Sequence, residues 1–294
     1  MSNYHKPAML NEVLGYMDIK PGMWYIDCNL GGGGHTKGIL EKGGNVLGID
    51  LDHSSIKEVS DKLSGYLSSG RLILEHNNFI HLEQIVRKYN IKPLGILFDL
   101  GISTHQLEKA ERGFSFNKDA SLDMRMDQTK NTATAKDLIN GLHEKELAEL
   151  FWKLGEENFS RQIARKIVEY RKKKQIETTN ELANIILSVR RRTPSDRTHP
   201  ATRVFQALRI VVNDELNTLK DTLPQAFEVL EPGGRLTIIS FHSLEDRIVK
   251  NSFKEFETSG KAKILTDKPL EPTEEEISKN PRARSGKLRV IEKL

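Results

Sequence analysis

Two acidic residues, Asp27 and Asp50, each end an apolar segment typical of a β-strand, and four glycines, Gly31–Gly34, lie between them. Glycine allows a backbone to turn sharply and to approach a ligand without an intervening side chain. The helix expected to begin near His35 would direct its free N–H groups at that ligand. A carboxylate about 20 residues after such a turn suits the hydroxyls of a ribose. The spacing therefore predicts a binding site for a nucleoside cofactor.

The segments around this site alternate between strand and helix patterns, which is typical of a parallel sheet covered on both faces. We expect four strands in the first part of the chain, over residues 24–28, 46–50, 71–75 and 95–100, and a helix over 82–89. The pattern returns with a long helix from Arg203 towards Thr222 and three more strands, over 235–241, 262–266 and 287–291. Because the strands end on groups such as Asp99, the carboxyl edge of this sheet is the expected ligand crevice.

No strand pattern is present over residues 105–199. A helix is expected over 144–154, and Gly155 is typical of the C′ position that follows one. The next helix, within 156–174, has an apolar face formed by Phe159, Ile163, Ile167 and Val168. Thr178 begins a capping box for a third helix. The sequence predicts an all-helical domain, residues 105–200, inserted between the two parts of the sheet domain, residues 1–104 and 201–294.

Composition bounds the class of protein. The 294 residues carry a formal net charge of +4, a mild excess that permits a polyanionic partner. No apolar run reaches the roughly 18 residues that span a bilayer, and the first residues lack a signal-peptide pattern, so no membrane partner is expected. The single cysteine, Cys28, excludes an internal disulfide, favours a cytoplasmic location and is expected to be a small buried residue. Scattered histidines and one cysteine predict no metal site.

Six further segments carry a family resemblance. In chain order they are 98–103 (FDLGIS), 111–116 (ERGFSF), 122–127 (LDMRMD), 199–203 (HPATR), 240–247 (SFHSLEDR) and 280–285 (NPRARS). With them the chain resembles, from His5 to Ile291, the bacterial 16S ribosomal RNA cytosine-N4 methyltransferases, which use S-adenosylmethionine (SAM). The chain departs from the family pattern at Cys28, at Asn29 and at Thr104-His105.

The resemblance implies a class I SAM-dependent methyltransferase fold, an α/β, Rossmann-like architecture with a seven-stranded, mostly parallel sheet and an inserted all-helical domain. It implies SAM as the cofactor, held by Gly33, Gly34, His35, Asp50, Phe79, Asp99 and Gln106. Asp50 would accept hydrogen bonds from the ribose, and Phe79 would stack on adenine. The implied partner is 16S ribosomal RNA of the small subunit, with a cytosine of the decoding centre as the target. Whether the substrate is naked RNA or an assembled subunit stays open. Whether the protein forms a homodimer also stays open.

Methyl transfer to the exocyclic amine of cytosine needs in-line alignment, because this amine is a poor nucleophile. Hydrogen-bond acceptors on its protons favour the reactive form. Many DNA amine methyltransferases use an Asp/Asn-Pro-Pro-aromatic loop for this purpose, and residues 99–103 stand in its place here. We expect Phe241 to stack on the cytosine and Ser240 or His242 to contact its amine or ring edge. For each of the three, a structural corner after a strand is the alternative.

Reaching the base requires unstacked RNA or an extruded nucleotide. Arg112, Phe114 and Phe116 interleave a cation with aromatic rings, which suits stacked bases. Phosphate-binding charge is expected from Arg190, Arg191, Arg192, Arg197, Arg203, Arg282, Arg284, Lys287 and Arg289. The lysines 172–174 are expected to form a solvated face.

Three other functions remain open from the sequence. The first is the same chemistry on another nucleic acid, such as DNA cytosine. The second is an NAD-dependent oxidoreductase, which shares the glycine turn and the ribose acid. The third is a non-catalytic RNA-binding or ribosome-assembly protein. Titration with SAM and NAD separates the second from the rest, and methyl incorporation from labelled SAM excludes the third.

Overall fold

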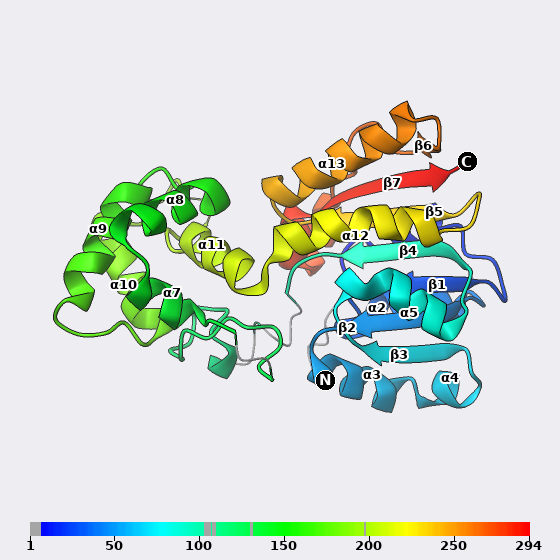
Figure 1. Cartoon of the computed structure of the whole chain (residues 1–294), viewed down its shortest axis with the longest axis horizontal. Helices are drawn as coiled ribbons and strands as arrows, with labels where there is room; N and C mark the ends of the chain where they lie inside the picture. Colours follow the sequence, from blue (N-terminus) through cyan, green and yellow to red (C-terminus); the bar gives the residue numbers. More distant parts are fainter. Residues whose placement is uncertain (1–6, 103–106, 108–109, 130–131, 197) are drawn as a thin grey trace. The chain divides into compact units, whose positions relative to one another are not determined.

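The computed structural model describes residues 7–102, 107, 110–129, 132–196 and 198–294. The chain divides into two compact units, unit 1 with Met1–His105 and Leu216–Leu294, and unit 2 with Gln106–Glu215 (Figure 1). The second division lies at 215 and not at 200, where the sequence placed it. The reason is that helix α11 (Thr202–Asn213), assigned from the sequence to the sheet domain, packs on helix α8 (Glu144–Gly155) of unit 2.

Unit 1 is built on a seven-stranded sheet with the order β3-β2-β1-β4-β5-β7-β6. The strands are β1 Trp24–Asp27, β2 Asn45–Asp50, β3 Leu72–His76, β4 Pro93–Asp99, β5 Arg235–Ser240, β6 Ala262–Ile264 and β7 Lys287–Lys293. Neighbouring strands are parallel except where β7 pairs with β5 and β6. Each strand overlaps the range that the sequence predicted, and the mostly parallel sheet is confirmed.

Successive residues of the central strands point to two different buried faces, as the strand period requires. Ile26, Leu47 and Ile96 belong to one apolar cluster, whereas Tyr25 and Val46 belong to the other. The first cluster is completed by helices α5 (Leu82–Tyr89), α12 (Glu215–Val229) and α13 (Ser243–Thr258), of which α5 and α12 lie over the sheet in the view of Figure 1. The second is completed by α1 (Leu10–Tyr16), α2 (Gly34–Glu41), α3 (His53–Lys62) and α4 (Ser64–Ser68).

The strand order reverses between β1 and β4, since β1 pairs with β2 on one side and with β4 on the other. Ligands of open α/β sheets bind at the carboxyl ends of the strands at such a switch point. Asp27 ends β1, Asp50 ends β2 and Asp99 ends β4. The fold therefore brings three carboxylates to the edge where the sequence predicted a ligand.

Unit 2 consists mainly of helices: α7 Ala135–Gly141, α8, α9 Ser160–Arg171, α10 Thr179–Val189 and α11. The capping box of Thr178 with Glu181 is confirmed. The role predicted for Gly155 is wrong, because Glu156 is the left-handed residue that ends α8 (φ 50°). A Cβ at Gly155 would lie 2.6 Å from the carbonyl oxygen of Arg203, so this glycine serves the close packing of α8 on α11.

Candidate cofactor and substrate site

The glycine turn is tied to the acid at the end of β2. The backbone N–H of Gly31 donates to Asp50 Oδ2, and the backbone N–H of Asp52 donates to Asp50 Oδ1. Both hydrogen bonds have a donor–acceptor distance of 2.8 Å. Gly33 has φ 74° and precedes α2, and a Cβ there would lie 2.9 Å from Val59 Cγ2. Asp52 caps α3 by accepting from Ser54 N. The turn thus needs glycine and holds the Asp50 carboxylate at the crevice.

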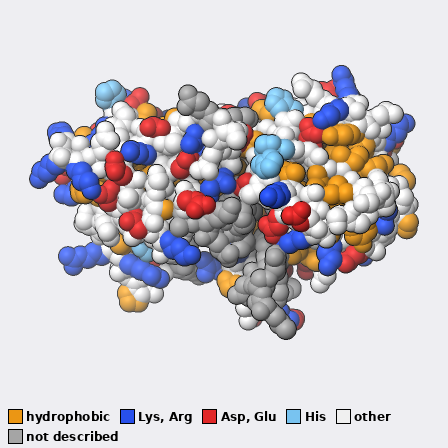
Figure 2. All heavy atoms as spheres, turned by 90° about the horizontal axis from the view of Figure 1, so that it is seen from below, with side chains coloured by type: hydrophobic (Ala, Val, Ile, Leu, Met, Phe, Trp, Pro, Cys, Tyr) orange, Lys and Arg blue, Asp and Glu red, His pale blue; other side chains and the backbone are white. Residues whose placement is uncertain are grey.

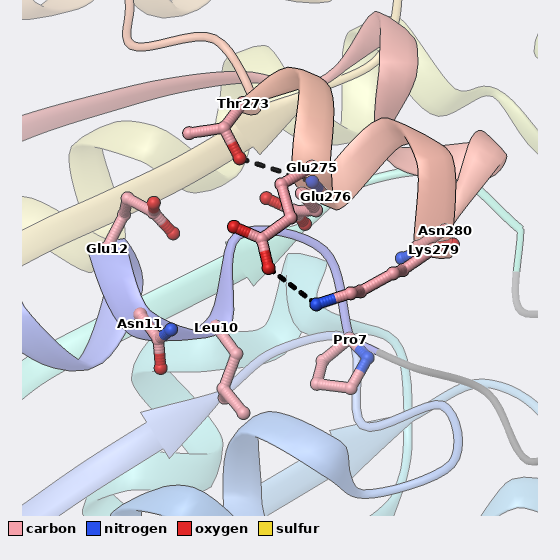
Figure 3. A pocket seen from close by; sticks show the side chains of 9 residues that line it. All are labelled: Pro7, Leu10, Asn11, Glu12, Thr273, Glu275, Glu276, Lys279 and Asn280. Atoms are coloured by element: carbon pink, nitrogen blue, oxygen red, sulfur yellow. Dashed lines mark hydrogen bonds and ion pairs between the residues drawn. The ribbon is translucent and has the colours of Figure 1, made fainter.

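Gly34 lies against Pro7, because a Cβ on residue 34 would stand 2.8 Å from Pro7 Cγ. Pro7 also lines a cavity of about 320 Å³ between α1 and helix α14 (Glu274–Lys279), drawn in Figure 3. The other lining residues include Glu12, Glu275 and Glu276, and none of the acids that end β1, β2 and β4. The lining of this cavity therefore does not include the acids of the predicted cofactor site, and Pro7 connects it to Gly34.

His35 joins the N-terminal segment to Asp99. Its Nε2 lies 3.0 Å from the carbonyl oxygen of Ala8, and its Nδ1 lies 3.5 Å from Asp99 Oδ2. A carbonyl only accepts, so Nε2 carries the proton and Nδ1 presents a lone pair to Asp99. Burial lowers the pKa of His35 to about 4, which keeps the ring neutral. The imidazole is therefore a buried linker, and any contact of His35 with a cofactor would be through its backbone.

The acids at the carboxyl edge are strongly desolvated. Burial raises the pKa of Asp27 to about 6, although Thr36 Oγ1 donates to it over 2.7 Å. Burial also raises the pKa of Asp50 to about 6, against the two backbone hydrogen bonds, and holds the pKa of Asp99 well above its ordinary value. Among the described residues, no lysine or arginine pairs with these three carboxylates.

Two buried oxygens of this region, Asn29 Oδ1 and Asp99 Oδ1, have no hydrogen-bond partner among the described atoms. Such atoms are costly unless a ligand satisfies them. The amino group of SAM supplies N–H donors, which suit the two unpartnered oxygens. The positive charges of its amino group and sulfonium suit carboxylates that have no lysine or arginine partner in the described part of the chain. The residues present therefore fit this cofactor.

Phe79 and Gln106 complete the predicted cofactor set. Phe79 follows β3 in a 3-10 turn (Phe79–His81), is half-buried and meets Phe98 edge-to-face at 5.4 Å. Its remaining surface is available for adenine. Gln106, like Thr104 and His105, lies outside the described residues. Cys28 is a buried free thiol, as predicted, and burial raises its pKa well above the ordinary value.

The segment after β5 is a well-ordered corner. His242 caps α13: its Nδ1 accepts from Glu245 N at 3.4 Å, and Glu245 Oε2 accepts from Phe241 N at 2.8 Å. Ser240 is buried, and its Oγ donates to the carbonyl oxygen of Lys287 at 3.4 Å. The ring of Phe241 faces Gly101 of the neighbouring strand end, where a Cβ would be 3.8 Å from Cδ2. Ser240 and His242 therefore do make the contacts of a structural corner after a strand. Their catalytic roles stay a prediction.

The aromatic RNA contacts expected in unit 2 need correction. Arg112 is buried, and its Nη2 donates to the carbonyl oxygens of Arg125 (3.1 Å) and Met126 (2.6 Å). Phe114 is buried as well, under the Arg112 guanidinium. Phe116 is half-buried and stacks on His199 with 4.5 Å between ring centroids. Arg112 and Phe114 are therefore parts of the unit 2 core, because a buried guanidinium or ring cannot meet a base.

The basic residues differ in exposure. Arg191, Arg192, Arg203, Arg282 and Arg284 are exposed, in keeping with phosphate contacts. Arg289 is buried in an ion pair with Asp246 at 2.6 Å, so its predicted contact with RNA is wrong. Lys287 lies 3.8 Å from the same carboxylate, and Arg197 is outside the described residues. Figure 2 shows that lysines and arginines are mixed with acids on the face it displays.

Three relevant residues were not singled out from the sequence as site residues. Asp27 stands four residues before the first glycine of the turn, and its position at a strand end was the available signal. Trp152 and Phe159 are exposed aromatic residues of unit 2. Leu147 and Phe151, four residues apart, form the buried face of α8. Trp152 follows Phe151 and so points away from that face, which was the available signal for its exposure. Phe159 was expected on the apolar face of α9, but that helix begins only at Ser160.

The chain is similar to known proteins over its whole length. A family model, the MraW methylase family, matches residues 2–294. Two proteins named ribosomal RNA small subunit methyltransferase H are similar to the whole chain. The one from Brevibacillus brevis is 44% identical over 100% of this chain and 99% of its own length, and the one from Acetivibrio thermocellus is 45% identical over 100% of both.

Two solved structures align over the whole length of this chain. An rRNA methylase from Streptococcus thermophilus has a TM-score of 0.45 and 11% identity, covering 100% of this chain and 99% of that one. A SAM-dependent O-methyltransferase from Thermotoga maritima has a TM-score of 0.44 and 7% identity, covering 100% of this chain and 68% of that one.

Among the described residues, no helix combines the length and the apolar character that spanning a membrane requires. The family match and the sheet order confirm the class I SAM-dependent methyltransferase fold, with SAM as the cofactor. This chain belongs to the MraW methylase family.

Proposed function

We propose that this enzyme transfers the methyl group of SAM to the N4 amine of a cytosine in the decoding centre of 16S ribosomal RNA, the family target cytosine 1402. The names of the two full-length relatives support a small-subunit ribosomal RNA substrate. The partner would then be the small ribosomal subunit or its RNA, and the location the cytoplasm. The lone buried cysteine is consistent with a reducing compartment.

The observation that carries the proposal is the wall formed by Phe241 beside Gly101. Gly101 has φ 100° and no side chain, and Phe241 stands against it from the end of β5. An aromatic ring next to bare backbone offers a flat apolar surface, which suits a pyrimidine ring. The wall lies beside Asp99, which ends β4. A base held there would be adjacent to the predicted cofactor crevice.

SAM, when bound, supplies an activated methyl group. The protein must then hold the amine in line with it and accept a proton from the amine. Phe241 would orient the ring. Ser240 or His242 would contact the amine or ring edge, and such a contact would have to compete with the partners that both side chains already have within the corner. Asp50 would hold the cofactor through hydrogen bonds with the ribose, and Asp99 would offer its unpartnered Oδ1 to an N–H donor of the cofactor. Asp27, whose two oxygens already accept hydrogen bonds from Asn29 and Thr36, would contribute negative charge.

The test is methyl transfer from labelled SAM to isolated small subunits and to naked 16S RNA, followed by nucleoside analysis and mapping. We expect N4-methylcytosine at one position of the decoding centre. A cytosine-containing DNA duplex serves as the competing substrate, and NAD as the competing cofactor. Methylation of DNA alone, a methyl group on another atom of cytosine, or tighter binding of NAD than of SAM would each contradict the proposal.

A further inference from the structure

Two aromatic side chains of unit 2 are exposed. Trp152, in the last turn of α8, is 57% exposed, and Phe159, immediately before α9, is 40% exposed. No other Trp or Phe among the described residues is exposed to this degree. Exposing rings of this size forgoes the stabilisation that burial would provide. The two rings therefore call for a functional explanation.

The loop between α8 and α9 holds Phe159 in a fixed position. Glu157 in this loop is fully buried, which is costly for a charged side chain. Its Oε1 accepts from Phe159 N at 2.9 Å, and its Oε2, which has no hydrogen-bond partner, lies 3.7 Å from Arg190 Nη1. The Arg190 guanidinium lies 5.9 Å from the centre of the Phe159 ring. Glu157 thus fixes the backbone at Phe159, and together with Asp196, whose Oδ1 accepts from Arg190 Nη2 at 2.6 Å, it holds the cation near the ring.

The surroundings of this loop are basic. Arg203 Nη1 donates to the carbonyl oxygen of Glu156 over 2.7 Å, which places the start of α11 beside the loop. Arg191 and Arg192 follow the end of α10, where Arg190 marks the C-cap. Arg191, Arg192 and Arg203 are exposed, and none of them forms an ion pair within the described residues. Exposed rings with unpaired arginines nearby are typical of surfaces that bind unpaired nucleic acid.

We propose that Trp152 and Phe159 each stack on an unpaired nucleotide of the substrate RNA, with Arg191, Arg192 and Arg203 on its phosphates. The two rings are together called the platform. The inference rests on the proposed function and gives unit 2 an RNA contact in place of buried Arg112 and Phe114. The unpaired arginines favour RNA over a protein partner. Arginine beside an aromatic ring also adds a cation–π contribution when a base stacks on it.

The chain offers a direct optical test, because it has only two tryptophans, Trp24 and Trp152. In a Trp24→Phe variant, fluorescence reports Trp152 alone. A single-stranded oligoribonucleotide with the decoding-centre sequence is expected to quench this emission, and added salt should reverse the quenching. Trp152→Ala and Phe159→Ala should each weaken RNA binding by about 5-fold to 100-fold, as stacked bases lose their partner. Trp152→Tyr and Phe159→Tyr keep a ring and are the matched controls.

Absence of quenching, or Ala variants that bind RNA as tightly as the Tyr variants, would overturn the platform. So would Ala variants that bind the RNA unchanged but lose self-association in sedimentation, or lose binding to the intact subunit. The first result would indicate an interface between copies, and the second a protein contact. SAM titration of every variant verifies that unit 1 is intact. Product mapping is independent: quenching without cytosine methylation would leave the platform standing and remove the proposed function.

Discussion

Gly31 donates its backbone N–H to Asp50 Oδ2 over 2.8 Å, so the acid expected to hold the ribose also fixes the start of the glycine turn. The second oxygen, Oδ1, accepts from Asp52 N at the same distance. A carboxylate oxygen can accept more than one hydrogen bond, so both oxygens retain capacity for a ligand. Cofactor affinity and the shape of the turn are therefore coupled through one side chain.

Asp50→Asn should weaken SAM binding by about tenfold or more, because charge-assisted hydrogen bonds to the ribose are lost and an amide N–H₂ opposes a backbone N–H. Isothermal titration with SAM measures the effect. Asp61→Asn, an exposed position on α3, is the control and should leave the affinity unchanged. Equal affinities for the two variants would exclude Asp50 from the cofactor site.

SAM affinity should depend on pH in a defined direction. Asp27 and Asp50, with pKa values of about 6, are ionised above that pH and bind protons below it. A cationic ligand is favoured by the ionised carboxylates, so the affinity should fall as the pH is lowered through about 6. His35, with a pKa of about 4, stays neutral over this range and does not contribute.

Titration with SAM and with S-adenosylhomocysteine at several pH values checks this expectation. The product lacks the sulfonium charge and should show a shallower dependence. Asp99, whose pKa burial also raises, should release a proton when the cation binds, so the measured heat should vary with the ionisation enthalpy of the buffer. A SAM affinity that rises on acidification would contradict the assignment.

Gly155→Ala should destabilise unit 2 by about 1–3 kcal/mol, because the added Cβ would meet the Arg203 carbonyl at 2.6 Å and force α8 away from α11. Denaturant unfolding measures the loss. Gly141→Ala, near which nothing lies within 4 Å of the added Cβ, is the matched control and should be neutral or slightly stabilising. SAM affinity should be the same for both variants. If Gly155→Ala were as stable as Gly141→Ala, the close contact would not exist in solution.

Arg112→Met and Arg203→Met should separate a structural arginine from an RNA contact. Arg112→Met leaves two carbonyl oxygens without their donor and should cost about 1–3 kcal/mol of stability. The salt dependence of RNA binding should be unchanged. Arg203→Met should instead reduce the slope of log affinity against log salt by about one. The reverse outcome would restore Arg112 as a phosphate contact.

His242→Asn should distinguish helix capping from chemistry. Asparagine is also a good N-cap residue, so this variant should keep the stability that His242→Ala loses, about 1 kcal/mol. If the imidazole contacts the cytosine, turnover by the Asn variant falls far more than its SAM affinity. Normal turnover by His242→Asn would limit this residue to its cap. Phe241→Leu, which removes only the aromatic ring, should raise KM for RNA in parallel.

The sheet and its ligand edge could be predicted from local pattern. Continuous apolar segments ending on Asp27, Asp50 and Asp99 specify buried parallel strands whose carboxyl ends meet, and Gly33 is needed where φ is positive. These features depend on spacing within a few residues. The exact ends of strands and helices were less well predicted because they depend on hydrogen bonds to neighbouring elements.

By itself, then, the sequence determined the alternation of strands and helices, the glycine turn with its acids, and the family. Only the tertiary structure decided which charged and aromatic side chains face solvent. Arg289 is held in an ion pair with Asp246, 43 positions away in the sequence. Arg112 donates hydrogen bonds to the carbonyl groups of residues 125 and 126. Trp152 and Phe159 are exposed although their residue types favour burial. The physical reason is that exposure is a sum over contacts with remote segments, which local periodicity does not contain.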